Sequence, residues 1–237
     1  MTSKIHAAAF LAALLAPASA SAGETGFFLG PDLSGGLAFG SSSTTNGGSA
    51  WAGGGIVSNV GFGTTVGIGG HAGYRFGPAL SAFVSYEHAW GDVSWNATFP
   101  MMGVASLFKG AAISDVVMGN IAYDLVLSDR TTLRAGFGAG LSFNSLAGVV
   151  ETDVASGGLV ARLADHTRTS PAVRIGAGIE HRVGARTVLG LNTAVSYVGG
   201  FETGNTRSAG GAAMPIGPYR IDDVWRASLG ASMRFEF

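Results

Sequence analysis

Apolar residues occupy every second position through several long stretches of this sequence. The clearest stretch, 133–144, sets an apolar row against a small or polar one: Leu133, Ala135, Phe137, Ala139, Leu141 and Phe143 against Arg134, Gly136, Gly138, Gly140, Ser142 and Asn144. The last ten residues, 228–237, alternate in the same way. A repeat of two is that of a β-strand with one apolar face. The pattern predicts strands whose apolar faces meet either a protein core or a membrane.

Eight such stretches follow one another, and connections of two lengths join them. The predicted strands cover approximately residues 25–39, 65–76, 79–92, 115–127, 132–144, 170–183, 187–198 and 223–237. Short turns are predicted near residues 77–78, 128–131 and 184–186, and long exposed loops over 40–63, 93–114, 145–169 and 199–221. An even strand count with short turns at one rim and long loops at the other is typical of an outer-membrane barrel.

Glycine helps to distinguish a membrane barrel from a soluble sandwich of two sheets. The chain has 39 glycines in 237 residues, and many stand opposite the apolar row, such as Gly67, Gly69, Gly136 and Gly138. A row facing water should carry lysine, glutamate and threonine, whereas small residues suit the crowded interior of a narrow barrel. The prediction is an all-β fold, a transmembrane antiparallel up-and-down β-barrel of eight strands, with short periplasmic turns and four long extracellular loops.

The first 22 residues have the layout of a secretory signal peptide. Lys4 precedes an apolar run from Ile5 to Ala16, and small residues follow up to Ala22. That run is shorter than the roughly 20 residues of a membrane-spanning helix. We expect cleavage before Gly23, so that residues 1–22 are removed and residues 23–237 form a single barrel domain.

Composition excludes several other classes of protein. The chain has no cysteine, so disulfides, thiol chemistry and cysteine-ligated metals are excluded. A formal net charge of -1 argues against a nucleic-acid partner, since such binding depends on cations that neutralise phosphates.

Aromatic residues gather towards both ends of the predicted strands. Those near the long loops are Trp90, Trp95, Tyr197, Tyr219 and Trp225, and those near the short turns are Phe27, Tyr74, Phe76, Tyr123 and Phe237. Two aromatic girdles are expected where a barrel crosses the two membrane interfaces.

The chain's end resembles the C-terminal signature of bacterial outer-membrane barrels, with Met233, Phe235 and Phe237 at every second position. Together with the segments 26–33, 122–125 and 136–141, it resembles the small eight-stranded, porin-like outer-membrane proteins of the opacity-protein and outer-membrane-protein-A transmembrane-domain type. The resemblance implies a bacterial outer-membrane location, contact with outer-membrane lipid and lipopolysaccharide, and recognition of the terminal strand by the barrel assembly machinery. It implies little about activity.

Charged residues are concentrated in the inward row near the short turns. They are Asp32, Arg75, Asp124, Arg134, Glu180, Arg182, Arg234 and Glu236. Because an unpaired buried charge is costly, these groups are expected to form ion pairs in the lumen. The network is interpreted either as a fixed plug or as the gate of a narrow pore. Arg174 and Arg226 are expected nearer the loops, where they either attract anions or are solvated.

No catalytic, cofactor or metal site is predicted. Lipid A deacylases of similar barrel size use a His-x-Ser pair, which none of His71, His88, His166 or His181 begins. His88 is expected to face lipid near the upper rim.

Three functions remain as hypotheses. The first is a barrel with structural and surface-interaction roles, the second a narrow passive porin gated by the lumen charges, and the third a lipid-modifying enzyme. Apolar loop segments at 99–102, with Leu107 and Phe108, and at 212–216 are expected either to bind a surface partner or to collapse on one another.

Overall fold

The computed structural model describes residues 25–42, 56–99 and 103–237 of the chain. The predicted signal peptide and residues 100–102 of the second predicted loop lie outside these ranges. Within them, no helix is long and apolar enough to span a bilayer.

The described chain forms one antiparallel sheet of 12 strands. The strands are β1 (Gly26–Ser41), β2 (Ile56–Phe62), β3 (Thr64–Arg75), β4 (Leu80–Phe99), β5 (Val104–Val126), β6 (Thr131–Asp153), β7 (Leu159–Leu163), β8 (His166–Arg182), β9 (Thr187–Glu202), β10 (Thr206–Ala209), β11 (Ala212–Pro215) and β12 (Arg220–Glu236).

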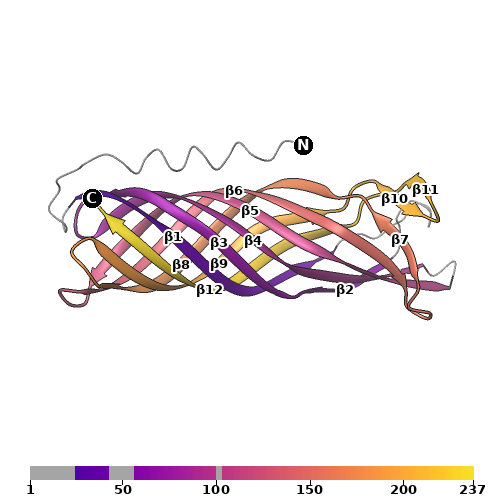
Figure 1. Ribbon diagram of the computed structural model, residues 1–237, viewed down its shortest axis with the longest axis horizontal. Coiled ribbons are helices and arrows are strands. Elements are labelled where there is room, and N and C mark those ends of the chain that lie inside the picture. The colour runs from indigo at the N-terminus through magenta and orange to yellow at the C-terminus, as the bar shows by residue number, and fades with distance from the viewer. Residues whose placement is uncertain (1–24, 43–55, 100–102) are drawn as a thin grey trace.

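Eight of these strands close into a ring in the order β1, β3, β4, β5, β6, β8, β9 and β12. The ring closes where β1 pairs with β12, from Phe28 opposite Glu236 to Ser41 opposite Asp222. At the C-terminus the Phe237 amide donates to the Phe27 carbonyl at 2.9 Å. The predicted eight-stranded barrel is confirmed, and Figure 1 shows it on its side with the C-terminus at the left end.

The outer face changes from apolar to polar partway along β4. From Leu80 to Trp90 the outward positions carry mostly apolar or aromatic side chains, and beyond Trp90 they carry Asp92, Ser94, Asn96 and Thr98. A tilted strand crosses a bilayer in about 9–11 residues, which matches the apolar part. On β12 the outward residues are apolar from Phe235 to Trp225, and the polar section begins at Asp223. We call this apolar outer surface of the ring the belt.

Beyond the belt the strands continue, so the predicted loops at 93–114, 145–169 and 199–221 are wrong over most of their described length. Residues 43–55 of the first predicted loop lie outside the described ranges. β4 and β5 extend through much of 93–114, and β6 continues to Asp153. The alternation persists there with opposite polarity: Val93, Trp95 and Ala97 are buried inside, and polar residues face outward. This reversal is expected where a barrel wall leaves lipid and enters water, since the apolar row must then turn inwards.

The extended wall encloses an apolar core above the belt. Its members include Val93, Trp95, Phe108, Leu146, Val149, Phe201, Tyr219 and Ile221. Trp95 is fully buried and stacks on Phe108 with ring centroids 5.3 Å apart, and Tyr219 packs against Phe108 at 4.8 Å. The assignment of Trp95 and Tyr219 to an aromatic girdle is therefore wrong, because both lie inside the barrel.

One strand bends into the lumen at this level. Pairing between β8 and β9 ends at Val173 opposite Tyr197, and the buried segment from Val198 to Phe201 leaves that ladder. The Asn144 amide on β6 donates to the carbonyls of Val198 at 2.6 Å and Gly200 at 3.0 Å. Gly199 has a φ of 79°, and a Cβ there would lie 2.1 Å from the Cβ of Ser170. Only glycine permits this bend, which narrows the lumen.

A small sheet extends the wall further. β7 pairs with β6, β10 with β7, and β11 with β10, and these strands lie at the right end of the barrel in Figure 1. The buried Glu151 on β6 fixes this sheet, because its carboxylate accepts from Arg207 Nε at 2.6 Å and from Ser106 Oγ at 2.8 Å.

Candidate functional site: the barrel lumen

The end of the lumen near the short turns holds a connected cluster of charges. The cluster consists of Arg75, Asp124, Arg134, Glu180, Arg182, Arg234 and Glu236, which we call the lower charge cluster. Arg75 lies 3.0 Å from Asp124, and Arg182 lies 2.5 Å from Glu236. The Arg234 guanidinium bridges two carboxylates, because it lies 2.9 Å from that of Glu180 and 3.1 Å from that of Glu236. The structure thus brings together all but one of the charged residues that the sequence places in the lumen.

Two aromatic rings, those of Phe28 and Phe83, pack against the arginines of this cluster. The Arg134 guanidinium lies 5.2 Å from the ring centroid of Phe83 and 5.8 Å from that of Phe28. Arg234 lies 5.4 Å from the Phe28 ring. Arg134 also donates to Ser81 Oγ at 2.7 Å and to Glu180 at 3.2 Å. Ion pairs and rings together fix these side chains across the lumen, as expected of a fixed plug.

Asp32 is the residue that stands apart. Its carboxylate lies 2.8 Å from Nδ1 of His71 on β3, and no ion pair to an arginine is formed by it within the described chain. Including Asp32 in the predicted network is therefore wrong in detail. The reason is depth: Asp32 pairs in register with Gly69 and Ser232, further from the short turns than the lower charge cluster.

A second charged layer lies further along the lumen. The Glu87 carboxylate on β4 accepts from Arg226 on β12 at 2.6 Å, from Arg174 on β8, and from Ser34 on β1 at 2.7 Å. We call Glu87, Arg174 and Arg226 the upper charge layer. Arg226 is 4% exposed, and both arginines are paired with Glu87, so the expectation that they are solvated or attract anions is wrong. The inward position of Glu87 on its strand is the sequence signal that indicates this layer.

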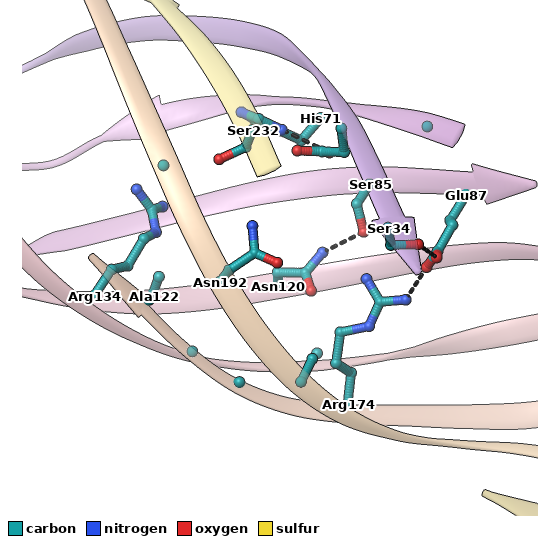
Figure 2. A pocket seen from close by; sticks show the side chains of 18 of the residues that line it. Ser34, His71, Ser85, Glu87, Asn120, Ala122, Arg134, Arg174, Asn192 and Ser232 are labelled. Atoms are coloured by element: carbon teal, nitrogen blue, oxygen red, sulfur yellow. Dashed lines mark hydrogen bonds and ion pairs between the residues drawn. The ribbon is translucent and has the colours of Figure 1, made fainter. Parts of the chain in front are cut away.

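A cavity of about 170 Å³ separates the two charged layers. Figure 2 shows Asn120, Asn192, Ser85, Ser34 and Arg174 around it, with Asn120 donating to Ser85 Oγ at 2.9 Å. At about 30 Å³ per water, the cavity has room for a handful of water molecules or one small polar solute.

Inward glycines make room for polar side chains from neighbouring strands. A Cβ on Gly67 would lie 2.4 Å from Ser34 Oγ and 2.6 Å from Glu87 Oε1. A Cβ on Gly138 would lie 2.2 Å from Asn120 Oδ1. The inward glycines therefore leave space for polar side chains in the lumen. A larger residue at these positions would displace the groups that form the upper charge layer and line the cavity.

Above the upper charge layer the apolar core closes the lumen. Burial raises the pKa of Tyr219, because the ionised phenolate would lose its hydration in this core. The free energy of unfolding of this region should fall as the pH rises past about 10, where an unfolded tyrosine ionises and a buried one does not.

We therefore expect high pH to destabilise the small sheet of β7, β10 and β11 at a lower pH than it destabilises the membrane-spanning belt. Because amide exchange is itself base-catalysed, hydrogen exchange at pH 8 and pH 11 is compared as protection factors, in which each rate is divided by the intrinsic rate at that pH. The protection factors of β7, β10 and β11 should be lower at pH 11 than at pH 8, while those in the belt portion of β5 stay unchanged. Tyr219→Phe is the matched control and should remove most of the difference. An equal pH response in this variant would contradict the assignment.

No catalytic triad of the kind found in hydrolases is formed by the described residues. His71 contacts Asp32, His88 contacts Asp115 and His181 contacts Thr131, and no described histidine joins both a carboxylate and a hydroxyl. The described residues also contain no group of three or more histidine, aspartate or glutamate side chains suited to a metal ion.

A closed ring of strands with an apolar belt outside and paired charges inside defines a transmembrane β-barrel. The chain belongs to the outer membrane protein beta-barrel domain family, whose model matches residues 8–235. It is thus a small protein of the bacterial outer membrane, and the resemblance seen in the sequence is confirmed.

Several solved structures are similar to this chain at low sequence identity. The outer membrane protein OprG from Pseudomonas aeruginosa is 10% identical with a TM-score of 0.50, over 91% of this chain and 97% of its own. The Neisserial surface protein A is 18% identical with a TM-score of 0.44, over 89% and 97%. The outer membrane protease OmpT from Escherichia coli is 10% identical with a TM-score of 0.44, over 90% and 95%. No curated protein sequence matches the chain. Of these three structures, the likeness to OprG reaches a TM-score of 0.50, and at 10% identity it shows the fold alone.

Proposed function

We propose that this protein is a non-conducting, non-catalytic barrel with a structural and surface-interaction role. The observation that carries the proposal is closure of the lumen at successive levels: the lower charge cluster, the upper charge layer and the apolar core. A pore needs a continuous polar path, and the fully buried Trp95 and Phe108 lie across its extracellular end. The water-exposed wall above the belt is the surface offered to partners.

The proposal includes an export and assembly route. Residues 1–22 serve as a cleaved signal peptide. The barrel assembly machinery recognises the terminal strand through Met233, Phe235 and Phe237, of which the first two face outward and are partly exposed. Outer-membrane lipid and lipopolysaccharide contact the belt. These roles are supported by family membership and by the pairing of β12 with β1, which closes the ring.

Planar-bilayer recording of the refolded protein tests closure. We expect no discrete conductance steps from the wild type, and none from Arg134→Ala, because removing one member of the lower charge cluster leaves the apolar core in place. Heat-modifiable gel migration should confirm that each sample is folded. Discrete steps whose size changes in Arg134→Ala would instead support a charge-gated pore.

A narrow passive porin is the second candidate, and the cavity between the charged layers favours it. Its polar lining would accommodate a small solute if the apolar core opened. Liposome swelling with small sugars distinguishes the two functions, since only the porin predicts uptake above that of empty liposomes.

Lipid modification is the third and weakest candidate. The pairing of His71 with Asp32 supplies a base and its partner, but no described hydroxyl contacts that histidine. Mass spectrometry of lipid A from cells that express the protein should show no mass change.

A further inference from the structure

A group of polar side chains lies on the outer, membrane-facing surface of the barrel. Tyr86 and His88 on β4 and Asp115 on β5 form it, and we call it the Asp115 cluster. The Tyr86 hydroxyl donates to Asp115 Oδ1 at 2.6 Å, and His88 Nδ1 lies 2.8 Å from the same oxygen. The side chains of His88 and Asp115 are 39% and 38% exposed. A carboxylate and an imidazole facing hydrocarbon would be strongly disfavoured, so this surface must meet polar groups.

The cluster lies at the upper edge of the belt. Trp90 is the last aromatic residue of the outward row on β4, before Asp92 begins the polar section, and its ring lies 5.4 Å from that of His88. Tyrosine and tryptophan concentrate at the headgroup level of a membrane. Since the long strand extensions lie on this side of the belt, the headgroups here are those of the outer leaflet.

The same side-chain chemistry recurs on the opposite side of the ring. Tyr197 on β9 and Trp225 on β12 have ring centroids 5.2 Å apart, and the Tyr197 hydroxyl lies 3.5 Å from Asp223. Asp223 has a φ of 53° at a register shift between β9 and β12. We call these residues the Asp223 cluster. An aromatic girdle explains the rings, but it does not explain an aspartate in each group.

An aromatic ring beside a carboxylate suits a sugar. The carboxylate accepts hydrogen bonds from hydroxyl or amide donors, and the ring packs against the apolar face of the saccharide. Asp115 Oδ1 already accepts from Tyr86, while its second oxygen has no donor within the described residues. That oxygen and the exposed face of Trp90 are therefore free for a ligand at the membrane surface.

We infer that the Asp115 cluster, with Trp90, binds the saccharide headgroup of an outer-leaflet glycolipid, and that the Asp223 cluster forms a second such site. The inference rests on the proposed contact with lipopolysaccharide and assigns that contact to named residues. A phosphate-binding site would need cations. The Asp115 cluster contains no lysine or arginine, and Arg168, which lies near Tyr197 of the Asp223 cluster, is already paired with Asp222 at 2.9 Å. Recognition here depends on sugar hydroxyls and amides.

The test compares stability in two kinds of vesicle. The wild type and His88→Leu/Asp115→Leu are refolded in phosphatidylcholine vesicles with and without lipopolysaccharide, and the midpoint of thermal unfolding is measured by heat-modifiable migration. We expect lipopolysaccharide to raise the wild-type midpoint, and the double variant to lose about half of this increment. Its midpoint in phosphatidylcholine alone should change little, because the three side chains of the cluster are partly exposed and the substitution leaves no buried polar group without a partner. Adding Asp223→Asn should remove most of the remainder.

Controls separate the possible failures. Thr193→Val, an exposed belt position on β9 away from both clusters, should keep the full increment. If lipopolysaccharide does not shift the wild type, the proposed contact itself is wrong. If the wild type and the double variant shift equally, the contact exists but this site is wrong. A shift that disappears for the wild type on chelation of divalent cations would indicate cation bridging and would also overturn the site. Native mass spectrometry should agree, with fewer glycolipid molecules retained on the double variant.

Discussion

Replacing Glu87 by glutamine is expected to destabilise the barrel by about 3–5 kcal/mol, because the buried guanidinium of Arg226 and the half-buried one of Arg174 then lose their carboxylate. Arg226 has no other ion-pair partner within the described chain, and its Nε is already buried without a hydrogen-bond partner. The free energy of unfolding should be measured by urea titration in lipid vesicles, with folded and unfolded fractions separated on unheated gels.

Two further variants identify the cause. Glu202→Gln removes a carboxylate from an ion pair whose arginine, Arg220, is more than half exposed, and should cost about 1 kcal/mol or less. Adding Arg226→Met to Glu87→Gln should recover part of the lost stability, since it removes one stranded charge. If Glu87→Gln behaves like Glu202→Gln, the upper charge layer contributes no more than a surface pair.

The belt and the closed ring could be predicted from the sequence because they depend only on local alternation. From Leu133 to Phe143 each outward residue is apolar and each inward one small or polar, and lipid exposure follows directly. Terminal Phe237, paired next to Phe27, likewise needs no knowledge of distant contacts.

The upper charge layer could not be predicted in the same way, because its members meet across the lumen. Glu87, Arg174 and Arg226 come from β4, β8 and β12, which are not neighbours in the ring, and their common height depends on the stagger of every strand between them. Sequence alone placed Arg174 and Arg226 by their distance from the loops. It did not give their height relative to Glu87.

The strand extensions beyond the belt could not be predicted for a different reason. In β4 the alternation continues beyond Trp90, but the apolar row of Val93, Trp95 and Ala97 changes from the outer to the inner face. Outward apolar residues therefore predict the strand only up to the point where the barrel wall leaves lipid. The reversal marks that boundary, and it distinguishes a wall extended into water from a flexible connection.

Substituting alanine for Gly140 on β6 is expected to destabilise the barrel by about 1–3 kcal/mol, because the new methyl group overlaps a neighbouring backbone. Its Cβ would lie 1.9 Å from the carbonyl oxygen of Val117 on β5. That carbonyl cannot retreat without disturbing the ladder in which Met118 stands opposite Gly140. Urea titration in vesicles measures the loss, and folding yield should fall with it.

Gly119→Ala is the matched control on the same pair of strands. A Cβ there would lie 3.9 Å from the Ala139 carbonyl, which is ordinary van der Waals contact, and the site faces lipid. Alanine at Gly119 should therefore leave stability unchanged or raise it slightly, since glycine is unfavourable within a strand. On β1, Gly30→Ala and Gly35→Ala should repeat the contrast, with Cβ distances of 1.7 Å and 3.9 Å to the nearest carbonyl oxygen. If the two variants of each pair lose the same stability, close approach of the strands does not require glycine at the inward positions.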